Sequence, residues 1–330
     1  MKVAVFSTKS YDKEYFEKFN DHNQHQITYF EAPLNLNTTN LTQGFQAVCV
    51  FVNDKLDKPV IEKLSDKGIK LITLRCAGFN NVDLKTAKAE NIKVLRVPAY
   101  SPRAVAEHAV ALIMALNRKI HKAYNRVREG NFSLEKLTGF NLYGKTVGVI
   151  GTGFIGVEFC KIMLGFGCKV IAYDIKKSKE LIKKGVKFIS FDTLLHESDI
   201  ISLHCPLIPE TYHLINKKGY SKMKNGAMLI NTSRGALINT KDTITALKSG
   251  KLGYLGIDVY EQEEHLFFKD LSEHIIQDDL IARLMTFPNV IITAHQGFFT
   301  KEALEQISTT TLENITNFEK GNPLLNEVKI

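Results

Sequence analysis

The chain has 330 residues, which exceeds the ~100–200 residues of a typical domain, so two packed units are expected. Hydrophobic residues make up 44% and charged residues 24% of the chain, and these ordinary values exclude a disordered, collagen-like or coiled-coil protein. The longest apolar stretch, Ala104 to Leu116, is interrupted by Glu107 and His108 and is shorter than the ~20 residues that span a bilayer. The chain begins without a signal-peptide pattern, so a cytoplasmic protein with no membrane segment is predicted.

Charge and cysteine usage restrict the partners further. The net charge is +8, but among the 43 basic residues lysines far outnumber arginines and are scattered along the sequence. Nucleic-acid binding favours clustered guanidinium groups, so we expect a solvated lysine-rich surface and no nucleic-acid partner. The five cysteines form no Cys-x-x-Cys pair, which predicts reduced, buried thiols and neither a disulfide framework nor a metal site.

The first hundred residues alternate short β-branched runs with helical patterns, which is typical of parallel sheets joined by crossover helices. Helices are expected at Val60–Asp66 and Leu84–Glu90. The predicted strands are Val3–Phe6, Ala47–Val52, Leu71–Leu74 and Val94–Val97. Together they suffice for a small open sheet.

Two prolines, Pro98 and Pro102, mark a boundary, and a single long helix is predicted from Arg103 to His121. Six further strands follow, a number that suits a dinucleotide-binding sheet: Thr146–Ile150, Val170–Tyr173, Ile200–His204, Ala227–Asn231, Tyr254–Val259 and Val290–Thr293. A last helix at Lys301–Phe318 is expected to pack back on the first unit. We therefore predict two Rossmann-like or flavodoxin-like α/β units, a discontinuous substrate-binding one (1–100 with 300–330) and a dinucleotide-binding one (101–299), with the active-site cleft between them.

The stretch from His121 to Gly144 is rich in apolar side chains but lacks a clear period. These side chains are Phe132, Leu134, Leu137, Phe140 and Leu142. Apolar side chains on a loop need a surface that buries them. We expect either an arm that clasps a second subunit or a loop that covers its own unit, and the arm is favoured.

A glycine-rich turn follows the first strand of the second unit. Residues 151–156 read Gly-x-Gly-x-x-Gly and continue with helical spacing. In this context Gly151 permits the tight turn, Gly153 lets the backbone approach a pyrophosphate, and Gly156 lets helix and strand pack closely. The free amides at the start of the helix favour phosphate.

The next strand ends at Asp174, 18 residues beyond Gly156, close to the ~20 expected of a ribose-binding acid. A carboxylate there accepts both ribose hydroxyls and repels a 2′-phosphate, so NAD is predicted over NADP. Alone, Asp174 would equally suit a surface cap. Strand, glycines, helix and acid together favour the nucleotide.

Arg234 follows a strand apolar enough to be buried, and strand carboxyl ends are where open α/β sheets hold ligands. A guanidinium group matches a carboxylate with two parallel hydrogen bonds, which favours substrate binding over a structural ion pair. The following strands end in three acids, Asp258, Glu261 and Glu263, and in His295. A carboxylate beside an imidazole fixes one tautomer, so such a pair can exchange a proton near neutral pH.

In the first unit, residues Cys76, Ala77, Gly78 and Phe79 also follow a strand. Their backbone amides would suit a nest for a substrate carboxylate, although an ordinary strand-to-helix turn is the alternative. Tyr100, beside the boundary prolines, would either reach the same cleft or pack in the hinge.

With these motifs in place, the chain resembles the D-isomer-specific 2-hydroxyacid dehydrogenases over nearly its whole length. Within that family it is most similar to the bacterial fermentative D-lactate dehydrogenases, a likeness carried further by Leu266–Asp270 and Ile276–Leu280. The stretches that carry the family resemblance are Arg75–Asp83, Val97–Pro102, Ala104–His108, the glycine-rich turn, Ser202–Leu207, Asn231–Gly235, Asp258–Glu263 and Ala294–Gln296.

The resemblance implies a role for each motif. It implies that Arg234 binds the substrate carboxylate and carbonyl, His295 donates the proton and Glu263 orients and charges that histidine. Asp258 is implied near the nicotinamide. The other residues implied around NAD are Phe154, Ile155, Asp174, Cys205, Pro206, Thr211, Thr232 and Ser233, and those implied around the substrate are Phe79, Tyr100 and Phe298.

The implied activity is the reversible, NADH-dependent reduction of pyruvate to D-lactate by a homodimer or tetramer. Two alternatives stay open on the residues alone. One is a dehydrogenase for bulkier D-2-hydroxy acids, which the side-chain volume around the substrate would decide. The other is an NAD-sensing binding protein, since corepressors of the same fold keep similar residues.

Overall fold

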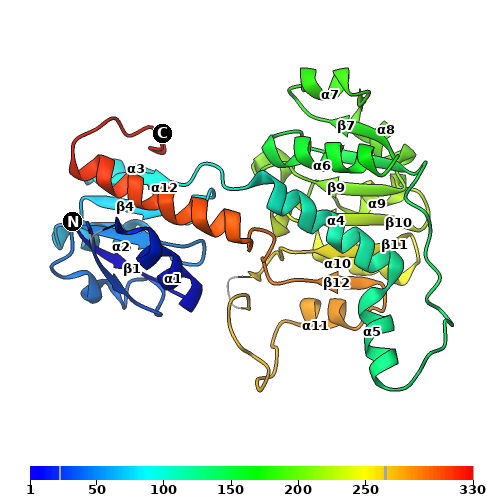
Figure 1. The fold of residues 1–330 in the computed structure, drawn as a ribbon, viewed down its shortest axis with the longest axis horizontal. Coiled ribbons are helices and arrows are strands. Elements are labelled where there is room, and N and C mark those ends of the chain that lie inside the picture. Colours follow the sequence, from blue (N-terminus) through cyan, green and yellow to red (C-terminus); the bar gives the residue numbers. More distant parts are fainter. Residues whose placement is uncertain (22–23, 264–265, 330) are drawn as a thin grey trace. The chain divides into compact units, whose positions relative to one another are not determined.

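The computed structural model describes residues 1–21, 24–263 and 266–329, and the chain divides into two compact units (Figure 1). Unit 1 contains Met1–Ser101 and Phe298–Ile330, and unit 2 contains Pro102–Gly297. Each unit has its own parallel sheet with helices on both faces, which confirms the predicted α/β class. No helix among the described residues is long and apolar enough to cross a membrane.

Unit 1 contains a five-stranded sheet in the order β2-β1-β3-β4-β5. Its strands are β1 (Lys2–Val5), β2 (Gln26–Tyr29), β3 (Ala47–Val50), β4 (Leu71–Leu74) and β5 (Lys93–Arg96), and its helices are α1 (Ser10–Phe19), α2 (Lys58–Asp66), α3 (Leu84–Ala89), α12 (Lys301–Glu319) and the short 3₁₀ turn η2 (Thr39–Thr42). The sequence predicted four strands and missed β2. That strand lies at the sheet edge and alternates exposed with half-buried residues, so it lacks the apolar run that marks the buried strands.

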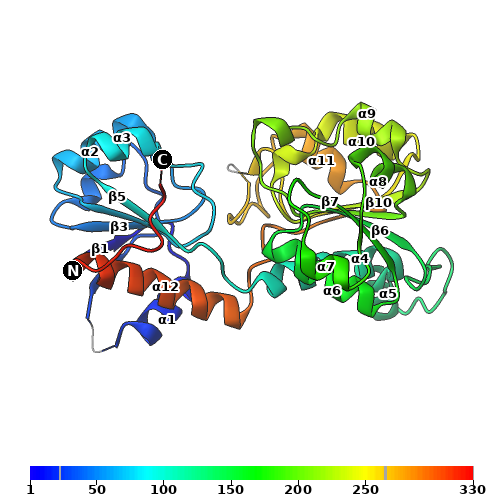
Figure 2. The same cartoon turned by 90° about the horizontal axis from the view of Figure 1, so that it is seen from above.

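The strands of unit 1 bury alternate residues against different helices, as the period of two requires. Ala4 and Val48 pack with α2 and α3, whereas Val3, Val5 and Leu312 lie in the core beneath α1 and α12. Figure 2 shows these helix pairs on opposite sides of the sheet. The C-terminal helix α12 therefore belongs to the first unit.

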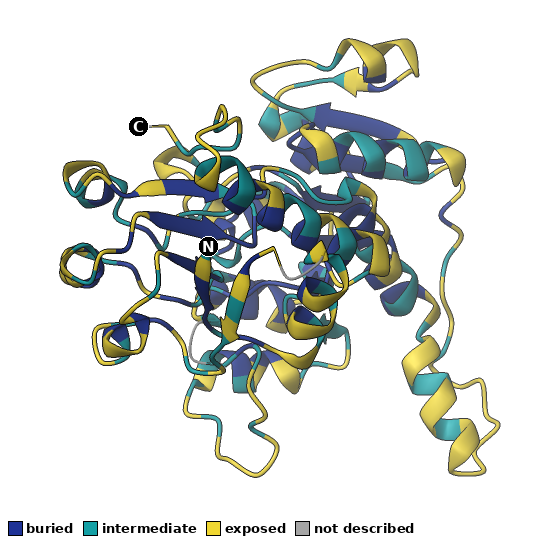
Figure 3. Cartoon of the chain, turned by 60° about the vertical axis from the view of Figure 1, so that its left-hand side comes forward, coloured by how far each residue is buried: buried dark blue, intermediate teal, exposed yellow. Residues whose placement is uncertain are grey.

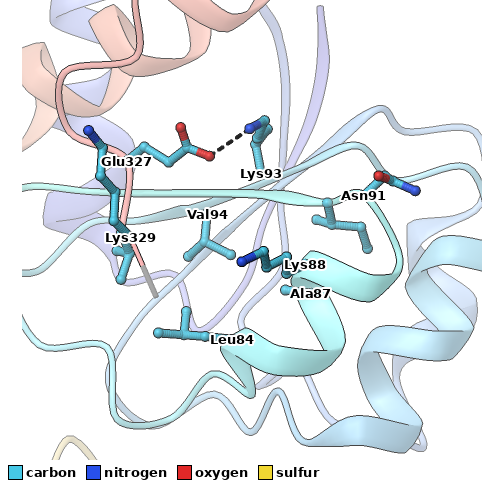
Figure 4. Close-up of a pocket in the computed structure, with 10 residues that line it drawn as sticks. Leu84, Ala87, Lys88, Asn91, Lys93, Val94, Glu327 and Lys329 are labelled. Atoms are coloured by element: carbon cyan, nitrogen blue, oxygen red, sulfur yellow. Dashed lines mark hydrogen bonds and ion pairs between the residues drawn. The ribbon is translucent and has the colours of Figure 1, made fainter.

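After α12 the chain returns along the outer strand β5. The amide of Val328 donates to the carbonyl of Val94 at 2.9 Å, and Lys93 pairs with Glu327 at 2.7 Å. Beside this contact a cavity of about 420 Å³ is lined by α3, β5 and the tail (Figure 4). The tail thus occupies an edge that would otherwise expose unpaired backbone groups.

Unit 2 contains a seven-stranded sheet in the order β12-β11-β10-β9-β6-β7-β8. The strands are β6 (Thr146–Ile150), β7 (Lys169–Tyr173), β8 (Lys187–Phe188), β9 (Ile200–Leu203), β10 (Ala227–Asn231), β11 (Leu252–Ile257) and β12 (Val290–Ile292). The prediction of six strands is wrong by one. The additional strand, β8, has two residues at the sheet edge and is too short to give a sequence period.

Helices cover both faces of the unit 2 sheet (Figure 2). Helices α4 (Pro102–Arg118), α6 (Phe154–Gly165) and α7 (Lys179–Lys183) contribute to one core. Helices α8 (Phe191–Glu197), α9 (Lys217–Lys222), α10 (Thr240–Lys248) and α11 (Asp279–Met285) contribute to the other, and the 3₁₀ turns η3 (Pro209–Thr211) and η4 (Gly235–Leu237) lie in loops.

The helix predicted from Arg103 to His121 is two helices in the structure, which is a second correction. Lys119 has a left-handed φ of 51°, and it separates α4 from α5 (Ile120–Arg128). No residue of α5 is buried. Figure 3 shows a helix and loop in exposed and intermediate colours, at the place that α5 and residues 129–141 occupy in Figure 1.

The two units meet in sequence at residues 101/102 and 297/298, whereas the sequence placed the second crossing after residue 299. The difference has a packing reason. The ring of Phe298 lies 6.0 Å from that of Phe51 and 6.2 Å from that of Tyr100, and Phe299 packs on Tyr11 at 4.7 Å. All of these aromatic partners belong to unit 1.

Candidate active site

The strand register of unit 2 places most of the expected site residues along one sheet edge. It aligns Ile150, Tyr173, Leu203, Asn231, Ile257 and Ile292 across six neighbouring strands. The segments that follow these residues begin with Gly151, Asp174, His204, Thr232, Asp258 and Thr293. Because neighbouring strands lie about 4.8 Å apart, the loops after β10 and β12 start on the order of 10 Å from each other. An arginine and a histidine can converge over that distance.

The three glycines of the turn have different structural demands. Gly151 has a φ of +93°, and a Cβ there would lie 2.6 Å from the amide nitrogen of Cys205. A Cβ on Gly156 would lie 2.1 Å from the carbonyl oxygen of Gly151. Gly153 has no atom within 4 Å of a Cβ position, so its side-chain space is open. These are the turn, the close packing and the open approach that a pyrophosphate needs.

Polar groups beside this turn fit a dinucleotide. Asp174 holds the turn by accepting from the Thr152 amide at 2.5 Å and its hydroxyl at 3.0 Å. Gly153 caps α6 without a side-chain hydrogen bond, so the first amides of that helix are free for phosphate oxygens. The buried hydroxyl of Thr232 has no hydrogen-bond partner among the described residues, which suits a polar ligand at the end of β10. Phe154 is exposed and Ile155 half-buried at the start of α6.

The loop after β9 is closed by its own hydrogen bonds. The hydroxyl of Thr211 donates to the carbonyl oxygen of Pro206 at 2.7 Å. The hydroxyl of Ser233 donates to the carbonyl oxygen of Cys205 at 2.7 Å, which ties this loop to the end of β10. Burial raises the pKa of the Cys205 thiol to about 11, so it acts as packing rather than as a nucleophile.

Arg234 follows β10 in a loop fixed by Asn231. The side-chain amide nitrogen of Asn231 donates to the Arg234 backbone carbonyl at 2.8 Å, and its side-chain oxygen accepts from the Ser233 backbone N–H at 3.1 Å. The guanidinium itself donates to the Ser233 carbonyl at 2.7 Å. No ion pair involves Arg234 among residues 1–21, 24–263 and 266–329, so the structure does not favour the structural ion-pair interpretation.

Each of the three acids after β11 meets a different histidine. The pairs are Asp258 Oδ1 with His108 Nε2 (3.3 Å), Glu261 Oε1 with His213 Nε2 (2.5 Å) and Glu263 Oε1 with His295 Nδ1 (2.9 Å). Glu261 is also engaged by the amide and hydroxyl of Thr240 at 3.3 and 2.8 Å. Glu263 is therefore the acid that contacts His295. His108 and His213 were not recognised from the sequence because nothing in a one-dimensional pattern pairs residues so far apart.

His295 lies in a strained backbone conformation with a φ of 54°, which a non-glycine residue adopts at a cost of order 1–3 kcal/mol. Its amide donates to the Asp258 carbonyl at 2.8 Å. Because a carboxylate only accepts, the contact with Glu263 places a proton on Nδ1, and Nε2 is the ring nitrogen that this contact does not use. The Phe268 ring lies 6.0 Å from the imidazole.

In unit 1, the residues expected at the substrate follow β4. The amides of Ala77, Gly78 and Phe79 have no acceptor within the described parts of the chain, as an anion-binding loop requires. Arg96 holds this loop by donating to the Ala77 carbonyl at 2.7 Å, with its guanidinium 5.1 Å from the Phe79 ring centroid.

Tyr100 and Phe298 belong to an aromatic cluster of the same unit. Phe51, the first residue after β3, is part of it through its contact with Phe298. The sequence analysis assigned Phe51 only to a strand, although an aromatic residue at the end of an apolar run could have been recognised as a candidate for this cluster.

A parallel sheet with a glycine-rich turn, an acid at the end of the next strand and an imidazole–carboxylate pair at one edge is typical of a nicotinamide-dependent oxidoreductase. The profile "D-isomer specific 2-hydroxyacid dehydrogenase, NAD binding domain" matches residues 110–297. The D-lactate dehydrogenase of Escherichia coli strain K12 is 53% identical over 328 residues, 99% of this chain and 100% of the relative. The chain belongs to the D-isomer-specific 2-hydroxyacid dehydrogenase family.

Solved structures agree with this assignment. The apo-structure of the Escherichia coli D-lactate dehydrogenase has a TM-score of 0.92 and 51% identity, with all of both chains covered. The NAD-complexed D-isomer-specific 2-hydroxyacid dehydrogenase from Lactobacillus delbrueckii ssp. bulgaricus has a TM-score of 0.82 and 32% identity, again over the whole of both chains. NAD is the cofactor of this chain, as predicted.

Proposed function

We propose that this protein catalyses the reversible, NADH-dependent reduction of pyruvate to D-lactate. The observation that carries the proposal is the Glu263–His295 hydrogen bond of 2.9 Å. It lies at the edge of the sheet where the glycine-rich turn and Arg234 also follow their strands. The family membership and the 53% identity to a D-lactate dehydrogenase support this substrate over bulkier D-2-hydroxy acids.

Bound NADH would supply the hydride for the substrate C2, and the protein manages the proton and the charge. Glu263 holds the Nδ1 proton of His295, so the imidazolium presents its second proton on Nε2. That proton passes to the carbonyl oxygen as the C=O bond becomes C–OH, and the Nε2 lone pair is restored. In the reverse direction the neutral imidazole accepts the hydroxyl proton.

Arg234 supplies the charge that binds the substrate in this proposal. Its fork of N–H donors suits the pyruvate carboxylate and polarises the adjacent carbonyl. For unit 1, we propose that the backbone amides of residues 77–79 bind a carboxylate group and that Tyr100 and Phe298 are apolar substrate contacts.

The test is NADH oxidation by the purified chain with a series of 2-keto acids of increasing size, followed by chiral analysis of the product. We expect pyruvate to be preferred and D-lactate to form. His295→Ala should slow reduction by ~10²–10⁴-fold, whereas His196→Ala, an exposed histidine on α8, should not. A chain that binds NADH but reduces no 2-keto acid would instead support a nucleotide-sensing protein. A preference for branched 2-keto acids would support a dehydrogenase for bulkier D-2-hydroxy acids.

We also propose that the active form is a homodimer or tetramer in which α5 contacts a second copy. Ile120, Tyr124 and Val127 are spaced along one helical face and are 60%, 59% and 51% exposed. Phe132 and Leu134 on the following loop are also exposed, which supports the arm over a loop that covers its own unit. Tyr124→Glu should shift the mass in analytical ultracentrifugation towards the monomer. Ile182→Glu, at an apolar residue of α7 that is 50% exposed, should not; an unchanged mass for both variants would exclude α5.

The cytoplasm is the compartment that we propose, because all five cysteines are buried free thiols and nothing in their arrangement requires an oxidising environment.

A further inference from the structure

Asp258 is a buried carboxylate with an unusually complete set of donors. It is 1% exposed. Its Oδ1 accepts from the Thr293 hydroxyl at 2.5 Å and from the backbone N–H of Gln296 at 2.9 Å. Its Oδ2 accepts from the backbone N–H of Gly297 at 2.8 Å. Burial works to raise the pKa of Asp258, but the hydrogen bonds from His108, Thr293 and the Gly297 amide outweigh it and lower the pKa. The group is therefore an anion.

Three of these donors belong to the segment that carries the proposed proton donor. Thr293 precedes His295 by two residues, and Gln296 and Gly297 follow it directly. A left-handed backbone at a non-glycine residue persists only where contacts with the surrounding structure hold it in place. The Asp258 carboxylate supplies that constraint on both sides of His295.

The remaining donor comes from a different element. His108 on α4 places Nε2 3.0 Å from the Thr293 hydroxyl oxygen and 3.3 Å from Asp258 Oδ1. Thr293 has a single hydroxyl proton, which it donates to Asp258, so its oxygen accepts from His108. Nε2 of His108 therefore carries a proton whatever the charge of the ring. A Cβ on Gly297 would lie 2.9 Å from Asp258 Oδ2 and 3.4 Å from His108 Cδ2, so the segment packs closely against both side chains.

We propose that His108 is a positioning residue, which fixes the direction of the His295 imidazole through Thr293 and Asp258. The inference rests on the proposed function of His295. Helix α4 begins at Pro102, the first residue of unit 2, and Gly297 is the last residue of that unit. The cluster therefore joins, inside unit 2, the two segments through which the chain enters and leaves that unit. His108 touches neither the glycine-rich turn nor Asp174 in any described contact, so its loss acts on alignment rather than on NADH binding.

Two substitutions at His108 test the proposal. His108→Leu removes the donor while keeping similar bulk, and His108→Gln keeps an N–H donor of comparable reach. A misplacement of about 1 Å can cost about 10²-fold in rate, so His108→Leu should lower kcat by about 10- to 100-fold and leave the Kd for NADH within about twofold. His108→Gln should recover most of the loss. Wild-type kcat in a folded His108→Leu protein, or a His108→Gln variant no better than His108→Leu, would overturn the proposal.

The chain offers a matched control in unit 1. The buried His25 also meets a threonine hydroxyl, with Nε2 2.9 Å from Thr316 Oγ1, and a carboxylate, with Nδ1 3.5 Å from Glu319 Oε2. His25→Leu should cost stability and leave kcat unchanged. If His108→Leu does not fold, Thr293→Val decides: it removes the bridging hydroxyl in the same shape and should lower kcat by about 3- to 10-fold, and an unchanged kcat refutes the proposal.

A readout without turnover separates this inference from the proposed function. The imidazole resonance of His295, assigned by its loss in His295→Ala, should shift or broaden in the NMR spectrum of His108→Leu but not of His25→Leu. A chain that reduces no 2-keto acid refutes the proposed function, while the NMR comparison still reports whether His108 fixes the segment. An unperturbed His295 resonance in His108→Leu refutes the positioning role alone.

Discussion

Replacing two glycines of the glycine-rich turn by alanine should separate folding from cofactor binding. In Gly156→Ala the new Cβ would lie 2.1 Å from the Gly151 carbonyl oxygen, well inside van der Waals contact. The obstacle is backbone, so α6 must move by on the order of 1 Å, and overpacking of this kind costs about 1–3 kcal/mol. We expect the upper end of that range, with Tm lowered by roughly 5–10 °C, and weaker NADH binding because the helix start shifts.

Gly153→Ala adds the same methyl group two residues after the start of the turn. Gly153 has an extended backbone (φ −69°, ψ −164°) and nothing within 4 Å of its Cβ position, so alanine fits the free protein. Alanine is a poorer N-cap than glycine, which lowers the free energy of unfolding, but it also restricts the unfolded chain, which raises it. The net change in the free energy of unfolding should stay within about 1 kcal/mol. The methyl group then fills the space through which a pyrophosphate approaches, and we expect the Kd for NADH to rise at least about tenfold.

Urea unfolding of the ligand-free variants gives the stability, and the fluorescence of bound NADH gives the affinity. The chain contains no tryptophan, so the NADH signal is read without tryptophan emission. A Gly153→Ala protein that loses as much stability as Gly156→Ala while binding NADH as wild type would refute the assignment of the two glycines.

Two further predictions concern charge. Arg234→Lys keeps the positive charge but loses the two-pronged geometry, so kcat/KM for pyruvate should fall by about 10- to 150-fold, equivalent to the ~1.5–3 kcal/mol of a charged hydrogen bond; an unchanged kcat/KM removes Arg234 from the substrate site. Burial and the nearby N-terminal ammonium group lower the pKa of His25, so below about pH 6.5 the unfolded chain binds a proton that the native chain does not. The free energy of unfolding should therefore fall as the pH drops, by up to about 1.4 kcal/mol per pH unit, and urea melts of His25→Leu should show a shallower fall; equal slopes would contradict the role of His25.

Local patterns identified much of the fold and the candidate site. The buried parallel strands were recognised because both of their faces are covered, which leaves continuous apolar runs such as Ala47–Val50. The edge strands β2 and β8 were missed because their exposed positions carry no such run. The break at Lys119 was missed because helical spacing continues through it, and a left-handed φ at a lysine leaves no mark in the sequence.

The sequence by itself determined the chemistry: which residues follow each strand, and so that a glycine turn, Asp174, Arg234 and His295 share one edge of a sheet. This holds because a parallel strand always delivers its last residue to the same side. The three carboxylates within six residues are equivalent in one dimension, and only the family resemblance implied that Glu263 pairs with His295. Tertiary structure alone decided the other two pairings. The structure places Glu263 against His295, and only the packed sheet and α4 assign Glu261 to His213 and Asp258 to His108.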